Sequence, residues 1–598
     1  MTRIDGYAPI RDYAVLGDGR TAALVARDGG VDWLTLPTLA SDPVFARMLD
    51  AERGGSLELE PLGEYDVERR YLPGTNVLET TYRTANGAAR VTDSVNLLDG
   101  GLLPWFELAR RVEGLAGEVE FRLRCDPRFP FADEEVTAAV VRSRPAWRCG
   151  DTQLTLMTWG ATDTTWDARA AGARVAVRGG ERALVALLAV QNEPRPFPLR
   201  EEIDGRIDST AGSWRSYVRE HTYDGEWKDG VTRSALVLKL LVYSPDGGIV
   251  AAPTTSLPEA LGGDANWDYR FGWVRDSAYT LDALIRLGRR EPAHASFSWL
   301  LREIRKTAPD VRPLYGLGGS PGYDERELDL AGYRGSRPVR MGNIAWTQRQ
   351  LGVYGDLLDT SWRWVDEGNS LDDSSRELLV EVLGALSKLW RREDSGFWEL
   401  RGPERHYTSS KIGAWLAFDR ATRLAQAGEL PQKDAPDWVR AADEIRSFVT
   451  ARCWSHELNA FTFYADADKL DTTTLLATRA EFADPRGAEL TGTIDAVRSR
   501  LTAGGPLLYR HTDSIGKEGA FVAATFWLAE ALARNGRVDD AASTLDAMLA
   551  LGNDVGVWSE EIDPTTNEFL GNVPQGLSHL SLVLAASTVS DAMRERPR

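Results

Sequence analysis

Cysteine and histidine are scarce in this chain, which has 598 residues but only 3 cysteines and 6 histidines. Cys125, Cys149 and Cys453 form an odd and widely spaced set, which argues against both a disulfide framework and a cysteine-ligated metal. The histidines are equally scattered along the chain. We therefore expect neither a metal nor a cofactor.

Long hydrophobic runs are also missing. No stretch approaches the length that a membrane-spanning helix needs, and the first residues, MTRIDGYAPIRDYAVLG, lack the basic and apolar segments of a signal peptide. Basic residues are outnumbered, since 70 Lys and Arg stand against 89 Asp and Glu, a net charge of −19. This balance argues against nucleic acids and anionic membranes as partners. We expect a cytoplasmic protein with a neutral substrate. The sequence leaves open whether the protein is a monomer or a homo-oligomer.

Tryptophan, in contrast, is abundant, with 20 copies. Such large side chains fill protein cores, and on a surface they offer flat faces that stack on sugar rings, so both uses are expected here. A chain of this length is too long for one compact core. The length therefore predicts two or three domains.

Residues 1–200 carry the alternating pattern of β-strands, as in Val31–Leu36 and Glu118–Leu123. Asn86-Gly87 separates two such runs and predicts a tight hairpin whose turn residues both have positive φ. Many short strands without intervening helices predict an antiparallel β-sandwich. A proline-rich stretch ends this region, and residues 201–228 are expected to link it to a second domain, residues 229–598.

From residue 229 onward, apolar residues recur at helical spacing. The clearest stripes cover 274–285, 378–390, 412–421, 438–448, 521–532, 538–549 and 577–586, and weaker ones lie near 230, 293, 344, 471 and 491. About twelve helices in this region suit an all-α (α/α)6 toroid, a ring of six helical hairpins. In such a ring we expect the functional residues on the loops at one end.

Two glutamates in tryptophan-containing loops are the first candidate site. Glu399 directly follows Trp398, and Glu560 closely follows Trp558. A glycosidase needs one protonated carboxyl to protonate the leaving oxygen and one ionised carboxylate to activate water. An acidic loop is more often simply solvated, so the pair gains meaning only from the rest of the chain.

The segment 266–276, NWDYRFGWVRD, is the densest in chemically useful side chains and directly precedes a predicted helix. An Arg-Asp pair can clamp sugar hydroxyls, because the guanidinium donates in a fork and the carboxylate accepts. The same residues suit a capped helix start with an ion pair. The composition of the segment favours neither interpretation.

This segment resembles the first-helix signature of glycoside hydrolase family 15, the family of glucoamylases and bacterial trehalases, in its actinobacterial type. Further segments resemble, in the same order as in the family, its bacterial sandwich domain, its substrate-binding loop, its general-acid loop and its general-base loop, namely 16–34, 332–343, 396–402 and 559–575. The resemblance therefore covers nearly the whole chain.

The resemblance implies a role for each matching residue. Glu399 corresponds to the general acid and Glu560 to the general base of an inverting enzyme. The implied substrate-binding residues are Tyr269 near the attacking water, Trp273 as an aromatic wall, Arg275 and Asp276 as the clamp on the terminal glucose, and Arg337 in the substrate-binding loop. Trp398 and Glu561 are further substrate-binding candidates because they lie next to the two catalytic candidates in the sequence.

We expect an exo-acting α-glucoside hydrolase of the glucoamylase type, which releases β-glucose from α-gluco-oligosaccharides. The alternative is a trehalase, and a disaccharide phosphorylase is less favoured because Glu560 stands in a base-like loop. Leu400 stands where fungal glucoamylases have a second acid, so the subsite for the leaving sugar is left open. The roles of Glu518 and of the segment 406–411 are also left open.

Overall fold

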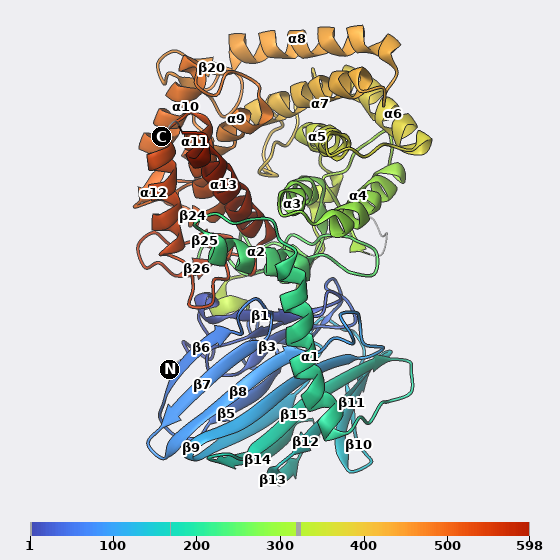
Figure 1. Ribbon diagram of the computed structural model, residues 1–598, viewed down its shortest axis with the longest axis vertical. Coiled ribbons are helices and arrows are strands. Elements are labelled where there is room, and N and C mark those ends of the chain that lie inside the picture. Colours follow the sequence, from blue (N-terminus) through green and yellow to red (C-terminus); the bar gives the residue numbers. More distant parts are fainter. Residues whose placement is uncertain (1–2, 168, 318–323, 597–598) are drawn as a thin grey trace.

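The structure, a computed structural model, describes residues 3–167, 169–317 and 324–596. It consists of an N-terminal antiparallel β-sandwich and a C-terminal all-α (α/α)6 toroid, stacked along the long axis of the molecule (Figure 1). The predicted fold class is thus confirmed.

The two layers of the sandwich share one long strand, β9 (Phe106–Asp126). The first part of β9 pairs with β8 (Gly87–Val95) and β15 (Arg182–Gln191), and the second part pairs with β5 (Ser56–Pro61) and β14 (Ala171–Arg178). The strand therefore passes from one layer into the other and ties them together.

The predicted hairpin is present between β7 (Leu78–Thr84) and β8, but its turn type was predicted wrongly. The turn residues are Ala85 and Asn86, and neither has a positive φ. Gly87 already belongs to β8, where a Cβ atom would lie 2.3 Å from the carbonyl oxygen of Ala116. Glycine is needed here for the close approach of β9, a tertiary contact that the local pattern does not reveal.

The predicted linker contains a helix, α1 (Arg200–Arg219), that packs on the sandwich. The Arg206 guanidinium donates to the Glu107 carboxylate at 2.7 Å, and the Thr210 hydroxyl accepts from the backbone N–H of Leu97 at 2.9 Å. The first part of the segment between the two domains is therefore anchored on the sandwich.

In the described part of residues 228–594, twelve α-helices, α2 to α13, form the toroid, as the sequence predicts. Six of them form the inner ring, in which each helix packs against the next and the last closes on the first: α3 (Val274–Arg286), α5 (Gly352–Asp366), α7 (Thr408–Gln426), α9 (Ala477–Ala480) with the preceding η6 (Thr472–Leu476), α11 (Val522–Arg534) and α13 (Gly576–Arg594).

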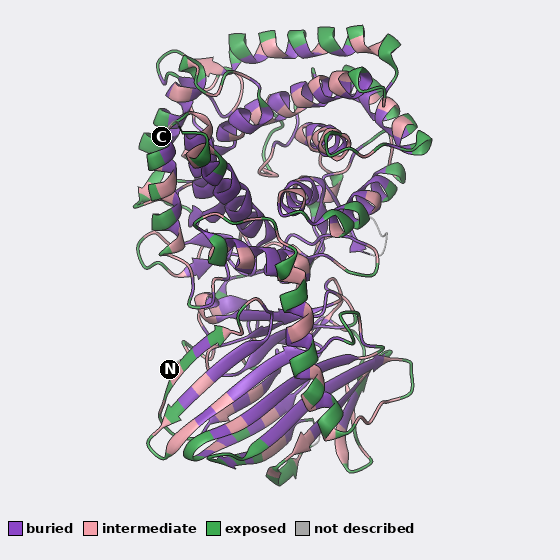
Figure 2. Ribbon diagram, in the orientation of Figure 1, coloured by how far each residue is buried: buried purple, intermediate pink, exposed green. Residues whose placement is uncertain are grey.

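The other six helices surround this ring: α2 (Lys228–Leu241), α4 (Arg290–Arg305), α6 (Asp373–Leu389), α8 (Ala435–Arg452), α10 (Ala488–Arg500) and α12 (Val538–Leu549). Figure 2 shows α13 buried and α8 exposed on its outer side. The weak stripes near 344 and 471 turn out to be 3₁₀ helices, η4 (Ile344–Thr347) and η6.

The loops that precede the inner helices are supported by the sandwich. The indole N–H of Trp33 donates to the carbonyl of Pro253 at 2.9 Å, and the Arg270 guanidinium donates to the carbonyl of Ser41 at 2.9 Å. Arg270 is part of the segment 266–276, which leads into α3. The first domain therefore helps to position the loops on which we expect the site.

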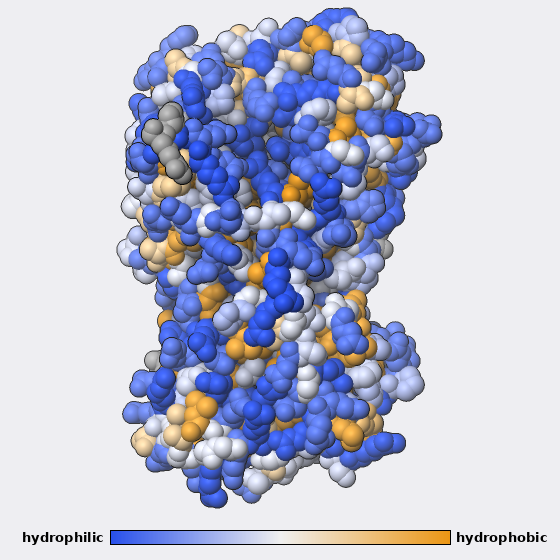
Figure 3. Space-filling model, viewed as in Figure 1, coloured by the Kyte–Doolittle hydropathy of each residue, from blue (hydrophilic) through white to orange (hydrophobic). Residues whose placement is uncertain are grey.

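Within the described residues, no helix is both long and apolar enough to cross a membrane. The face shown in Figure 3 is largely hydrophilic, with hydrophobic residues scattered over it.

Candidate active site

Glu399 lies in the loop before the inner helix α7. Its backbone has a left-handed φ of 59°, and the indole N–H of Trp273 donates to its carboxyl oxygen Oε1 at 2.5 Å. The side-chain amide of Gln348 donates to its backbone carbonyl at 3.0 Å. Burial raises the pKa of Glu399, Arg275 opposes the shift and Asp276 adds to it. The environment thus favours the protonated form, which a general acid requires.

Glu560 lies in the loop before α13, and its backbone pairs with both neighbouring segments. Its N–H donates to the carbonyl of Asn572 at 3.2 Å, and its carbonyl accepts from the N–H of Val522 at 3.0 Å. The Tyr269 hydroxyl donates to Oε1 of Glu560 at 2.7 Å. Burial, together with the charges of Glu560 and Glu259, raises the pKa of Tyr269 well above its usual value, so the phenol keeps the proton that it donates.

The second oxygen of Glu560, Oε2, is buried and has no hydrogen-bond partner among the described residues. Gly571 approaches it so closely that a Cβ atom there would lie 2.5 Å away. Gly571 also has a φ of 71°, which favours glycine. Burial and the nearby Glu259 raise the pKa of Glu560 to about 8, while Arg510 opposes the shift.

The two glutamates are linked through the side chains that hold them. The rings of Tyr269 and Trp273 meet edge to face, with centroids 5.5 Å apart. Both carboxyls line one pocket, with an empty volume of about 410 Å³, which we call the inner pocket. The other side chains that line it belong to Ala251, Tyr269, Trp273, Arg275, Asp276, Phe397, Trp398, Arg510, Phe521, Gln575 and Leu577.

The two Arg-Asp pairs of segment 266–276 have different surroundings. Arg270 and Asp268 are buried together, 2.7 Å apart, and do not line the inner pocket. Arg275 and Asp276 both line it; they lie 3.0 Å apart, and Asp276 stands in the first turn of α3. The Arg275 guanidinium also donates to the carbonyl of Phe397 at 2.9 Å. Arg275 and Asp276 thus form an ion pair at the start of α3 that also faces the pocket, whereas Arg270 and Asp268 form a buried pair outside the helix and the pocket.

Trp398 forms a wall of the inner pocket, and its orientation is set by a residue that sequence reasoning missed. Its indole N–H donates to the carboxylate of Asp471 at 2.9 Å, and its ring meets Phe521 edge to face at 5.0 Å. Asp471 is fully buried at the start of η6, where it also accepts from the N–H of Thr473. The only local signal for Asp471 was its suitability as a helix cap.

The structure does not bring Arg337 to the inner pocket. Its side chain is exposed and donates to the carbonyl of Ala331 at 3.2 Å. Arg510 and Gln575 line the pocket instead, although neither was predicted. Gln575 lies in the segment that resembles the general-base loop, whereas the residues around Arg510 carried no motif that could have revealed it.

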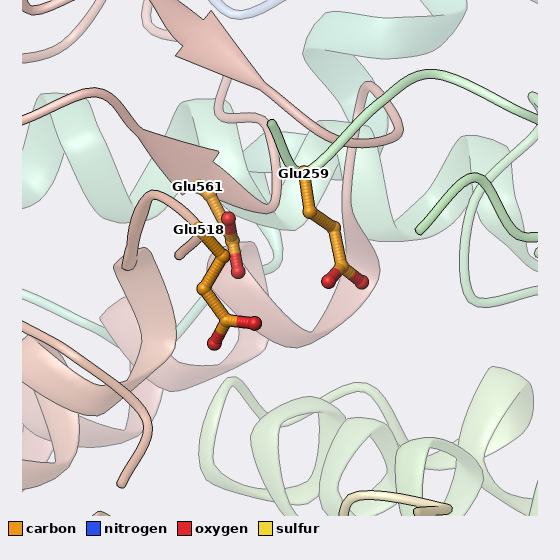
Figure 4. A group of neighbouring side chains, drawn as sticks. All are labelled: Glu259, Glu518 and Glu561. Carbon is orange, nitrogen blue, oxygen red and sulfur yellow. The ribbon is translucent and has the colours of Figure 1, made fainter. Parts of the chain in front are cut away.

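Arg510 is surrounded by carboxylates. Glu259, Glu518 and Glu561 have oxygen atoms within 4.8 Å of one another (Figure 4). The guanidinium of Arg510 pairs with Glu518 at 2.6 Å, with Glu561 at 3.1 Å, and with Glu259. The three carboxylates have a spacing that would suit a cation, and the guanidinium takes that place. Glu561 thus faces Arg510 and does not line the inner pocket.

Replacing Arg510 by glutamine is expected to lower the free energy of unfolding by about 3–5 kcal/mol, because it leaves buried carboxylates without their cation. Loss of the cation raises the pKa values of these carboxyls in the folded state. The destabilisation should therefore shrink as the pH is lowered and the carboxyls take up protons. Urea unfolding at several pH values measures both effects.

The control for this experiment is Arg440→Gln, since Arg440 pairs with Asp437 on the exposed side of α8. Its effect should stay within about 0.5 kcal/mol. A loss of similar size in both variants, or one that does not depend on pH in Arg510→Gln, would contradict the role given to Arg510.

A second pocket, which we call the outer pocket, adjoins the inner one. It has an empty volume of about 1070 Å³ and shares Tyr269, Trp398, Glu399 and Arg510 with the inner pocket. Its lining includes Trp267, Leu400, Arg401, Lys517 and Glu518, but not Glu560. Glu399 thus faces both pockets and Glu560 faces only one.

The segment 406–411 has a structural use. The buried ammonium group of Lys411 donates to the carbonyls of Trp390 and Arg392 at 2.6 Å each. Trp390 directly follows the last residue of α6, so Lys411 satisfies backbone acceptors at the end of that helix.

Two carboxyls that face one pocket beside aromatic walls and an Arg-Asp pair have the arrangement of a glycoside hydrolase. A family model described as glycosyl hydrolases family 15 matches residues 225–587, and one described as trehalase-like, N-terminal, matches residues 5–193. The chain belongs to glycosyl hydrolases family 15, as its motifs indicate.

Similar proteins cover nearly the whole chain. It is 35% identical to the trehalase of Mycolicibacterium smegmatis, over 98% of this chain and 92% of that protein. It is 33% identical to the trehalase of Mycobacterium tuberculosis, over 98% and 91%, and 31% identical to the trehalase of Thermoplasma volcanium, over 99% and 95%. A solved structure of a bacterial glucoamylase complexed with acarbose has the same fold, with a TM-score of 0.73 at 12% identity, over 98% of this chain and 95% of that one.

Proposed function

We propose that this protein is a trehalase, which hydrolyses α,α-trehalose to two molecules of glucose. Three relatives named trehalase are 35%, 31% and 33% identical to it over nearly its whole length. Trehalose thus takes the place of the α-gluco-oligosaccharides that the sequence analysis put first. The observation that carries the chemistry is that Glu399 and Glu560 line one pocket, held by the touching side chains of Trp273 and Tyr269.

We infer from the positions of the two glutamates which sugar each pocket takes. In an inverting reaction, water attacks the sugar from the face opposite to the leaving group. The base must therefore face the sugar that is attacked, and the acid must reach the oxygen between the two sugars. The inner pocket contains both glutamates, so it takes the attacked glucose, and the outer pocket, which contains only Glu399, takes the leaving glucose.

Within this assignment, Glu399 gives its proton to the bridging oxygen while the bond to the attacked glucose breaks. Glu560 accepts a proton from the water that attacks the anomeric carbon, and its unpartnered Oε2 is suited to receive it. Arg275 and Asp276 bind hydroxyls of the attacked glucose. Room for the water requires the two carboxyl groups to stand about 6.5–9.5 Å apart, which stays a prediction.

The test is hydrolysis of trehalose, maltose and isomaltose in phosphate-free buffer, followed by proton NMR during the first turnovers. We expect trehalose to be the preferred substrate. Inversion yields one β-glucose from the attacked ring and one α-glucose from the leaving ring, so the two anomers should appear in equal amounts before mutarotation. A retaining reaction would yield α-glucose alone.

Preference for maltose or isomaltose would restore the glucoamylase-type expectation. Release of glucose phosphate on addition of phosphate, with no hydrolysis in its absence, would indicate a phosphorylase. Either outcome would overturn the proposed function.

A further inference from the structure

Arg401 lies two residues after Glu399 on the same loop and lines the outer pocket. Its guanidinium makes a two-pronged contact with the carboxylate of Glu325, at 3.0 Å and 2.5 Å, and lies over the ring of Trp267, with Cζ 4.2 Å from the centroid. These two contacts hold a long, flexible side chain in one position at the wall of the pocket.

Arg340 has similar partners but is used differently. It also lies over Trp267, at 4.5 Å, and contacts Glu325 at 3.2 Å. Its guanidinium further donates to the backbone carbonyls of Asp264 and Asn266, and the residue is buried. Arg340 is thus part of the framework that supports Trp267 and Glu325.

Arg401 keeps free donor capacity. Among the described residues it donates hydrogen bonds only to Glu325, and 42% of its side chain is exposed. A guanidinium has five N–H donors, so several remain for a ligand in the outer pocket. Sugar hydroxyls accept such hydrogen bonds, and a fork that is already held in place loses little freedom when it binds.

We propose that Arg401 is a specificity-determining residue that donates hydrogen bonds to hydroxyls of the leaving sugar, and that Glu325 and Trp267 hold it in position. The proposal rests on the proposed function of this site. Because Glu399 must reach the bridging oxygen, the residues that follow it on the loop face the leaving sugar. Trehalose presents that sugar through its C1 and maltose through its C4, so a fixed donor meets different hydroxyls in the two substrates.

The experiment compares two substrates that differ only in the leaving group, trehalose and α-glucosyl fluoride. Fluoride does not fill the outer pocket, whereas the attacked glucose is the same in both. Arg401→Ala should lower kcat/KM for trehalose about 10- to 100-fold, which corresponds to a lost hydrogen bond from a charged donor. It should leave kcat/KM for α-glucosyl fluoride within about twofold of the wild type, since no contact to the attacked glucose is lost.

Two further variants sharpen the test. Arg401→Lys keeps the charge but loses the fork, and should reduce trehalose hydrolysis less than Arg401→Ala does. The matched control is Arg391→Ala, because Arg391 also lies over a tryptophan, Trp390, and pairs with a glutamate, Glu444, but lines neither pocket. It should leave both substrates unchanged.

Equal losses on both substrates would indicate a structural role and overturn the proposal, and so would unchanged trehalose hydrolysis in Arg401→Ala. If Arg401→Ala does not fold, the same comparison with Arg401→Lys decides. Failure of the proposed function is a separate result, visible in the wild type as hydrolysis of maltose and not of trehalose. The comparison with α-glucosyl fluoride then tests Arg401 with maltose as the disaccharide.

Discussion

Glu560→Gln is expected to lower kcat for trehalose by about 10³- to 10⁴-fold, because an amide cannot accept the proton of the attacking water. Glutamine has nearly the same shape, and its amide oxygen can still accept the hydrogen bond from Tyr269. The loss should be equally large with α-glucosyl fluoride, since water must attack the same carbon. Steady-state kinetics with both substrates measures it.

Although Glu560→Gln should lower kcat, it should leave the stability of the fold unchanged or raise it. The pKa of Glu560 is raised to about 8, so above the pKa of about 4.3 that an unfolded glutamate has, ionisation favours the unfolded state. Glu560 therefore lowers the free energy of unfolding progressively as the pH rises from about 4.3 towards 8. Glutamine does not ionise, so the variant lacks this destabilisation. Glu560→Gln should unfold at the same or a higher temperature than the wild type at pH 7. Wild-type turnover, or a variant that fails to fold, would contradict the role given to Glu560.

Glu399→Gln is expected to lower kcat for trehalose by about 10³-fold while largely sparing α-glucosyl fluoride. A sugar alkoxide is a poor leaving group that needs a proton, whereas fluoride leaves without one. The amide of the variant cannot supply that proton, but water attack through Glu560 is unaffected. Measuring glucose release from trehalose and fluoride release from the fluoride separates the two roles.

The pH dependence provides the second measurement for Glu399. The wild type requires Glu560 ionised and Glu399 protonated, so kcat/KM should rise with pH through one macroscopic pKa and fall through another. Burial raises both pKa values, and the optimum should therefore lie above the usual carboxyl range. With α-glucosyl fluoride, Glu399→Gln should lose the fall at high pH and keep only the rise that reports the ionisation of Glu560. Equal losses on both substrates, or an unchanged fall at high pH, would contradict the assignment of Glu399 as the acid.

The architecture could be predicted well because periodicity is a local property of the chain. Alternation marked the strands, and stripes such as those of 412–421 and 577–586 marked the inner helices α7 and α13. The error in the hairpin turn arose because a distant segment decided the local structure: Gly87 serves the approach of β9 and not a turn. The expected linker contains α1, which packs on the sandwich, and its boundaries stay a prediction.

The same holds for the candidate site: residues in local motifs could be predicted, and residues brought in by distant segments could not. Trp273, Asp276 and Glu399 could be named because they lie in dense, recognisable motifs, and the structure brings them to one pocket. Arg510 and Asp471 could not be named, since neither residue lies in a motif that indicates a role in a binding site. Arg337 has such a motif, yet its side chain donates to the carbonyl of Ala331 and lines neither pocket.

The sequence by itself determined the family, the two kinds of domain and the pair of glutamates, because these depend on composition, periodicity and short motifs. The tertiary structure alone decided what surrounds that pair. Burial and the nearby Glu259 raise the pKa of Glu560, and Trp273 orients Glu399 from another loop. The outer pocket, with Arg401 held over Trp267 at its wall, forms only when loops from several inner helices meet at one end of the ring. Distance and desolvation set these properties, and neither can be read along a single chain segment.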